Sequence, residues 1–120
     1  MKLREELHNE LRQQIVNLPG VTERQNAGIH EDAFFVGQVM FMHIHGWGHC
    51  DIRLSKSDQA RVLVEGKARA HQWAPKQGYV TFLVHGENDL EPAMELIRMS
   101  HDHFAEQGNV ITHAGGEQQR

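Results

Sequence analysis

The chain has 120 residues, of which 39% are hydrophobic and 23% are charged, and its formal net charge is -4. This length and composition predict one globular domain that folds without disulfides or a structural metal. The negative net charge disfavours electrostatic binding to nucleic acid or to anionic membranes. No apolar run is long enough to span a bilayer. The charged N-terminus contains no signal-peptide pattern, so we expect a cytoplasmic protein.

Cysteine and histidine stand out among the residue counts. Cys50 is the single cysteine, which excludes an intramolecular disulfide and any site built from several thiolates. The ten histidines would carry the net charge from -4 to +6 if all were protonated. We therefore expect the surface potential of the protein to respond steeply to pH.

The first thirty residues predict a helix followed by an irregular segment. Residues 2–18 indicate an amphipathic helix that ends at Pro19 and Gly20. Residues 21–32 are polar and contain Asn26 and Gly28, which is typical of a loop or a short edge strand. The apolar residues at helical spacing are Leu3, Leu7, Leu11, Ile15 and Leu18.

Residues 33–54 predict two consecutive β-hairpins. The first joins residues 33–36 to residues 39–45 through a two-residue turn, with Gly37 where a type II′ turn requires glycine. The second joins residues 39–45 to residues 49–54 through a three-residue loop from Gly46 to Gly48. Gly48 can adopt the left-handed conformation that usually ends such loops.

Alternation along these strands sorts the side chains onto two faces. Counting outward from the second loop, His45 pairs with His49 and His43 pairs with Asp51. One face is apolar and is expected to be the core face: Ala33, Phe35, Met40, Met42, Ile44, Cys50, Ile52 and Leu54. The opposite face mixes apolar and polar residues: Asp32, Phe34, Val36, Val39, Phe41, His43, His45, His49, Asp51 and Arg53. Its apolar members predict that a loop, a helix or a second subunit covers that end.

The second half of the chain predicts two helices and two strands. Residues 55–68 indicate a short helix with Ser55 or Ser57 as its N-cap and Gly66 as its stop. Strands are expected over residues 69–73 and 79–85, with a turn at residues 75–78 between them. A long helix is expected over residues 89–107, with Asn88 or Asp89 as its cap. Its apolar stripe is Leu90, Met94, Ile97, His101 and Phe104.

Together these elements predict an α+β fold. The expected architecture is an antiparallel sheet of about five strands, with the N-terminal and C-terminal helices packed on its apolar face. Residues 1–108 are expected to form the single domain. Residues 109–120 are expected to form a C-terminal tail that is partly disordered.

The polar groups of the second hairpin are the main candidates for a functional site. Cross-strand partners have Cβ atoms roughly 4.5 to 5.5 Å apart, so these groups can share one small ion. Imidazole and carboxylate ligands suit a divalent transition metal such as zinc, iron or nickel. The candidate metal ligands are His43, His45, His49 and Asp51. The candidate contacts for a small-molecule ligand are Trp47, Asp51, Arg53, His71 and Tyr79.

Three other interpretations of this face remain open. A histidine opposite a carboxylate can be an ordinary hydrogen-bonded pair on a solvated sheet. A metal-free acid and base site would have Asp51 orienting His43, with no nucleophile beside it because Cys50 points to the core. A non-catalytic homodimer would place the histidines at the border of an apolar interface. That interface would consist of Phe34, Val36, Val39 and Phe41.

Several motifs occur in an order that is typical of one known family. LPGVTE follows the first helix, and then come MHIHGWGHCDIRL, VEGKARAHQWAPKQGYVTFLV and ELIRMSHDHF. This order resembles the luciferase-domain family of small bacterial proteins, whose function is uncharacterised. The usual family pattern is Pro-Gly-Val, then His-x-His-Gly followed by Asp, then His-x-x-x-Pro-x-Ser-Gly-Trp. The likeness covers roughly residues 16–104.

The resemblance implies which residues matter, position by position. The family residues that the chain retains are His43, His45, Asp51, His71, Pro75 and Gly78. Gln77 stands where the family has serine and Tyr79 where it has tryptophan, so this chain lacks that serine hydroxyl. A looser likeness, of layout alone, links the chain to small double-wing, YjbR-like proteins, which have been regarded as DNA-binding modules. The acidic charge makes nucleic acid the least favoured partner.

Overall fold

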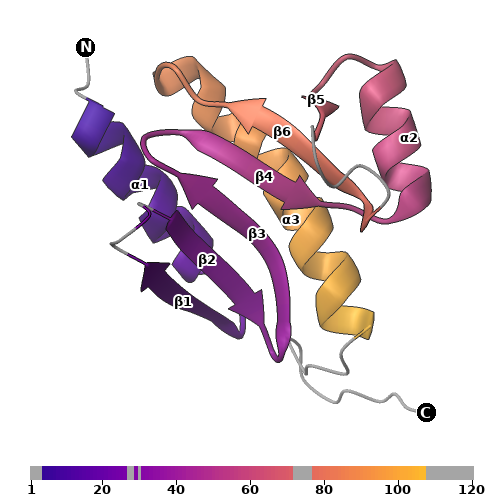
Figure 1. Cartoon of the computed structure of the whole chain (residues 1–120), viewed down its shortest axis with the longest axis horizontal. Coiled ribbons are helices and arrows are strands. Elements are labelled where there is room, and N and C mark those ends of the chain that lie inside the picture. Colours follow the sequence, from indigo (N-terminus) through magenta and orange to yellow (C-terminus); the bar gives the residue numbers. More distant parts are fainter. Residues whose placement is uncertain (1–3, 27–28, 30, 72–76, 108–120) are drawn as a thin grey trace.

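The computed structural model in Figure 1 describes residues 4–26, 29, 31–71 and 77–107. Six antiparallel strands form one sheet in the order β1-β2-β3-β4-β6-β5. The strands are β1 (Val21–Asn26), β2 (Glu31–Val36), β3 (Val39–His45), β4 (His49–Arg53), β5 (Arg69–Ala70) and β6 (Tyr79–Leu83). The helices are α1 (Arg4–Val16), α2 (Lys56–Val64) and α3 (Leu90–Gln107), with a 3-10 turn η2 (Glu87–Asp89) before α3. The predicted α+β class is therefore confirmed, with one strand more than expected.

The extra strand is the segment after α1. Residues that looked like a loop or a short edge strand form β1, which pairs along its whole length with β2. This strand is polar and mostly exposed, so the alternation of apolar residues that usually reveals a strand is missing from it. Because β1 is the edge strand of the sheet, most of its side chains can remain in contact with solvent.

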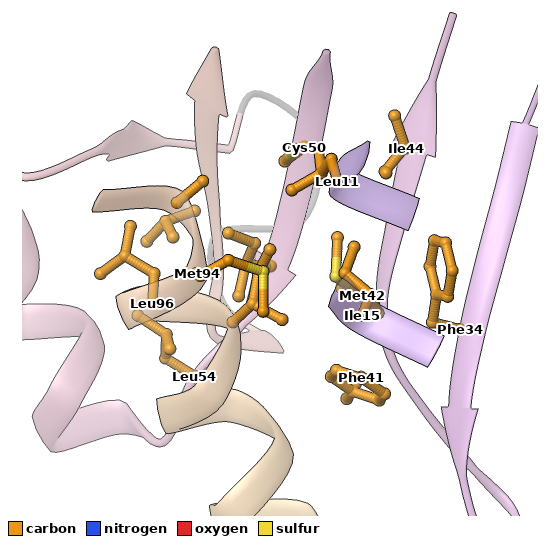
Figure 2. Close-up of a cluster of buried hydrophobic side chains, with 14 of the residues drawn as sticks. Leu11, Ile15, Phe34, Phe41, Met42, Ile44, Cys50, Leu54, Met94 and Leu96 are labelled. Carbon is orange, nitrogen blue, oxygen red and sulfur yellow. The ribbon is translucent and has the colours of Figure 1, made fainter. Parts of the chain in front are cut away.

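Helices α1 and α3 lie on the same face of the sheet (Figure 1). Figure 2 shows the core between these layers, where Leu11 and Ile15 of α1 and Met94 of α3 meet the strand residues Met42 and Ile44. The predicted stripe of α3 is buried along its length. None of the described helices is long and apolar enough to cross a membrane.

Both hairpins have the predicted loops. Val36 pairs with Val39 across the first turn, where Gly37 has a φ of 62°. In the second hairpin the register is as predicted, with His45 opposite His49. The predicted N-cap of α2 is also present, because the Ser55 hydroxyl accepts a 3.1 Å hydrogen bond from the backbone N–H of Asp58. These local features follow from short stretches of sequence.

Strand β3 contains a bulge that the alternation of residues did not reveal. Phe35 pairs with Met40 but Phe34 pairs with Met42, so Phe41 is the extra residue between them. Phe41 and Met42 are consecutive, and both are fully buried. A bulge of this kind places two residues of one strand opposite one residue of its partner. The part of β2 before the bulge is therefore shifted by one residue from the predicted register.

This shift corrects the predicted faces of β2 and β3. Phe34, Val36 and Phe41, expected on the histidine face, are fully buried in the core. Phe35 and Met40, expected in the core, are partly exposed. The predicted dimer interface is wrong for the same reason, because three of its four residues are not on the surface. Homodimerisation itself stays a prediction, without this interface.

Gly48 in the second loop is held by a close backbone neighbour. Its φ is 92°, and a Cβ atom there would lie 2.5 Å from the carbonyl oxygen of Val84. The same region is tied by a 2.8 Å hydrogen bond from the N–H of Val84 to the carbonyl of Gly48. We expect Gly48→Ala to lower the free energy of unfolding by about 2 kcal/mol, because it combines backbone strain with a steric clash.

Gly46 provides the matched control for this change. Its φ is also positive, at 57°, but a Cβ atom there would have no neighbour within 4 Å among the described residues. Gly46→Ala should therefore cost only about 1 kcal/mol from the left-handed backbone. Urea unfolding of both variants measures the difference. Equal losses of stability in the two variants would contradict the close approach at Gly48.

An ion pair links α1 to the edge strand β1. The guanidinium of Arg12 donates to both carboxylate oxygens of Glu23, at 2.5 and 2.6 Å. The hydrogen bond from Arg12 lowers the pKa of Glu23 below its ordinary value and outweighs the opposing effect of burial. The ionised carboxylate is thus favoured in the folded state, and this stabilisation is lost as the pH falls through the folded-state pKa.

Glu23→Gln should therefore destabilise the protein in a pH-dependent way. We expect the free energy of unfolding to fall by about 1 kcal/mol at pH 7, where the wild-type carboxylate is ionised. The difference should shrink toward zero below the ordinary pKa of 4.5, once the wild-type group also becomes protonated. Denaturant unfolding between pH 7 and pH 3 tests this. A difference that grows toward low pH would contradict the assignment.

The last predicted features are resolved in part. Strand β5 has two residues, Arg69–Ala70, and is shorter than the strand predicted over residues 69–73, because His71 already lies outside it; residues 72 and 73 are not among the described residues. Of the predicted turn at residues 75–78, only Gln77 and Gly78 are described. Asp89, one of the two predicted caps, accepts hydrogen bonds from the backbone N–H groups of His85 and Gly86. The predicted tail at residues 109–120 lies outside the described residues.

Candidate functional site

One row of residues crosses the sheet on the face opposite the helices. Pairing places His43 opposite Asp51, Asp51 opposite Thr81, and Thr81 opposite Arg69. Paired residues on neighbouring strands share a face, so this row brings side chains from β3, β4, β6 and β5 together. Asp51 lies in the middle of the row. The site is therefore built around a carboxylate of a central strand.

Four histidines surround the Asp51 carboxylate. The Nε2 atoms of His43, His45 and His71 lie 3.0, 3.3 and 3.4 Å from its Oδ2 atom. The Nε2 atom of His49 lies 3.2 Å from Oδ1. His43 lies opposite Asp51 and His45 lies diagonal to it across the hairpin, whereas His49 precedes Asp51 by two residues on the same face of β4. His71 approaches from the end of β5, which only the sheet order makes a neighbour.

The Asp51 carboxylate is buried and ionised. Its side chain is 2% exposed. Burial raises the pKa of Asp51, but hydrogen bonds with His43 and Thr81 and the charges of the histidines outweigh burial and lower this pKa to about 2. The Thr81 hydroxyl donates to Oδ1 at 2.8 Å. A fixed anion thus lies beneath a layer of imidazole rings.

The histidines differ in their surroundings. Burial, and then the charge of His43, lower the pKa of His45, which favours the neutral imidazole that binds metals. His43 packs edge-on against His45, with ring centroids 4.7 Å apart. Its Nδ1 atom is buried and has no hydrogen-bond partner within the described part of the chain. A buried ring nitrogen without a partner carries a desolvation cost.

Glu31 is a site residue that the sequence pattern missed. It lies opposite His45, and its Oε2 atom is 3.8 Å from the Nε2 atom of His45. The predicted register placed Asp32 on this face instead, but the bulge at Phe41 turns Asp32 toward α1, where it contacts His8 at 3.3 Å. If the sequence had indicated that Phe41 and Met42 are both core residues, the bulge could have been predicted. The shifted register would then have placed Glu31 opposite His45.

Two sets of side chains have the spacing of metal ligands within the described residues. The donor atoms of His43, Asp51 and His71 lie within 4.8 Å of one another, and so do those of Glu31, His43 and His45. The four predicted ligands thus lie close together, because His43, His45 and His49 all contact the carboxylate of Asp51. His49 contacts Asp51 but belongs to neither of the two tight sets.

The cluster opens into a cavity of about 680 Å³. Tyr79 forms part of its wall, with its ring centroid 5.7 Å from that of His43 and 5.6 Å from that of His71. Burial raises the pKa of the Tyr79 phenol, so this group stays protonated. The remaining lining is mixed in character: Glu31, Met40, His45, His49, Asp51, Arg69, Ala70, Gln77, Thr81 and Leu83. The cavity is large enough for a small molecule.

Three residues discussed from the sequence lie away from this cavity. Trp47 is 52% exposed and packs edge-on against His8, 5.1 Å away, where it lines other hollows. The Arg53 guanidinium lies 4.9 Å from the ring centroid of Phe104, and its Nε donates to the carbonyl of Gln77. Cys50 is buried, and burial raises the pKa of its thiol to about 12, which makes it a poor nucleophile.

Comparison with known families identifies the family to which the chain is similar. A family model described as the luciferase domain matches residues 38–100, more than half of the chain. The chain belongs to the luciferase-domain family. The matched segment of this family includes the four histidines and Asp51, whereas Glu31 precedes it. No curated protein and no solved structure matches the chain. The likeness of layout to double-wing proteins therefore stays a prediction.

Proposed function

We propose that this member of the luciferase-domain family binds a divalent transition-metal ion and presents it to a small molecule in the adjoining cavity. The primary ligands are His43, Asp51 and His71. The observation that supports this most directly is the convergence of three imidazole Nε2 atoms on one carboxylate oxygen. Those distances run from 3.0 Å for His43 to 3.4 Å for His71.

The spacing suits a metal centre better than a hydrogen-bond network. Ligand atoms held about 2.0 to 2.2 Å from a tetrahedral zinc ion are separated by about 3.3 to 3.6 Å. A single carboxylate oxygen cannot be the best acceptor for three N–H groups at once, because it offers two lone-pair directions. A cation among these atoms would use the imidazole lone pairs and the carboxylate charge together.

The ligand set also favours an ion that can bind a further molecule over an ion with a purely structural role. Two imidazoles and one carboxylate leave coordination positions open, and zinc, iron and nickel all accept such ligands. When bound, such an ion polarises an oxygen of a ligand or lowers the pKa of a bound water. The chain supplies the cavity wall, where Tyr79 and Arg69 offer a phenol and a cation to a small polar molecule.

Elemental analysis of untagged protein, purified without chelator and then incubated with zinc, tests this proposal. Wild-type protein should retain zinc after gel filtration, and the His43→Ala/His71→Ala double variant should lose it. His85→Ala is the control, because His85 lies beyond the end of β6 and outside the cluster. Retention in both wild type and control, with loss in the double variant, supports the proposal. Equal metal content in all three proteins, or no metal in any, overturns it.

A further inference from the structure

We infer that the small molecule bound at this site is an organic acid, with its carboxylate paired to Arg69 and a second oxygen on the metal ion. This inference rests on the proposed function and adds the chemical class of the molecule. The observation behind it is the position of one cation, Arg69, in the wall of the cavity that also contains Asp51.

Arg69 lies on the same face of the sheet as the candidate metal ligands. It pairs with Thr81, which in turn pairs with Asp51, so the three residues form one row across β5, β6 and β4. Neighbouring strands lie about 4.8 Å apart, which puts the backbones of Arg69 and Asp51 about 10 Å apart. Both residues line the cavity. A molecule of a few carbon atoms can therefore contact both an ion on Asp51 and the guanidinium of Arg69.

Two polar groups of the cavity wall are available to a bound molecule. Within the described part of the chain, the Arg69 guanidinium makes no ion pair and no hydrogen bond. The ring of Tyr79 lies beside those of His43 and His71, and its hydroxyl has no hydrogen-bond partner among the described residues. A guanidinium matches a carboxylate with two parallel N–H donors, and a phenol donates one further hydrogen bond. Arg69 therefore suits the carboxylate, and Tyr79 suits an oxygen near the ion.

The charges of the cavity favour an anion once a divalent ion is bound. Among the described residues, its lining contains the carboxylates of Glu31 and Asp51 and the guanidinium of Arg69, a net charge of -1 with the histidines neutral. A divalent ion changes this charge to +1, which one carboxylate neutralises. A phosphate group carries about 1.5 to 2 negative charges near neutral pH and would leave an excess of negative charge. The balance therefore favours a carboxylate over a phosphate ester.

The apolar part of the wall favours an organic molecule over an inorganic anion. Met40, Ala70 and Leu83 line the same cavity, whose volume is about 680 Å³. Sites for small molecules combine apolar side chains with a few polar groups that fix the orientation of the ligand. Here the polar groups are the ion position and Arg69, and the apolar side chains suit the carbon atoms between the two oxygen groups of the ligand.

A matched pair of hydroxamates tests the inference, because a hydroxamate group binds zinc and holds each probe on the ion. One probe is the monohydroxamate of succinic acid, and the other has a carboxamide of the same shape in place of the carboxylate. Titration calorimetry measures their affinities for zinc-loaded protein. Wild type should bind the carboxylate probe about tenfold or more tightly than the amide, because the amide cannot make charge-assisted hydrogen bonds to Arg69. In Arg69→Gln the two affinities should agree within about threefold.

Arg98→Gln is the matched control, because Arg98 belongs to α3, which covers the other face of the sheet. It should keep the wild-type preference for the carboxylate probe. The amide probe should bind all three proteins equally, which verifies that Arg69→Gln leaves the metal site intact. A preference that is lost only in Arg69→Gln supports the inference.

The other outcomes separate this inference from the proposed function. If zinc-loaded wild type binds both probes equally or binds neither, the inference is overturned and the metal site still stands. A preference that persists unchanged in Arg69→Gln also overturns the inference, because the carboxylate is then recognised elsewhere. If the wild type retains no zinc, both the inference and the proposed function are overturned.

Discussion

Phe41→Ala is expected to lower the free energy of unfolding by about 3 to 5 kcal/mol, the usual cost of removing a buried phenylalanine. Phe41 is fully buried at the bulge of β3, and its ring packs edge-on against His101 of α3 at 5.8 Å. Its carbonyl also accepts a hydrogen bond from the hydroxyl of Ser100. Truncating the ring leaves a cavity between the sheet and α3. Urea unfolding measures the loss.

Phe35→Ala is the control that makes this prediction specific to the bulge. Phe35 lies on the other face, where Arg24 stacks on its ring at 4.3 Å, and it is partly exposed. Its truncation should cost about 1 kcal/mol. An unbulged β3 would place Phe35 in the core and Phe41 on the outer face. A larger loss in Phe35→Ala than in Phe41→Ala would therefore show that the bulge is absent.

Asp51→Asn is expected to weaken zinc binding by about a thousandfold or more. The change removes the charge that faces four histidines, and even residues that only support metal ligands are worth about 10- to 100-fold in affinity. Because a ligand that binds only the folded state stabilises it, zinc should raise the melting temperature of the wild type but not of Asp51→Asn. Titration calorimetry and thermal unfolding with added zinc are the measurements.

Two variants separate the role of Asp51 from a general loss of negative charge. Asp32→Asn removes the same charge from the other face of the sheet and should leave zinc affinity within about twofold of the wild type. Thr81→Val removes the hydroxyl that donates to Asp51 at 2.8 Å and should weaken binding by about tenfold. If Asp51→Asn binds zinc as tightly as the wild type, Asp51 is not a ligand.

The local structure of the chain could be predicted from short stretches of sequence. Gly37 and Gly48 fix the two hairpin loops because few other residues adopt positive φ. The loop in turn sets the register of β3 and β4, since pairing is counted outward from it. That register was enough to bring His43, His45 and His49 to Asp51. These results depend on residues within a dozen positions of one another.

The sequence by itself thus determined the α+β class, the hairpin loops and the histidines around Asp51, because each depends on local backbone preferences. Only the tertiary structure decided the position of Glu31. Phe41 and Met42 are both buried in the core beneath α3, and this requires a bulge in β3 that shifts the register of β2. Two adjacent apolar residues in a sequence do not by themselves predict such a bulge. His71 is a similar case. It reaches Asp51 because β5 and β6 extend the sheet beyond β4, and strand order depends on packing between distant segments.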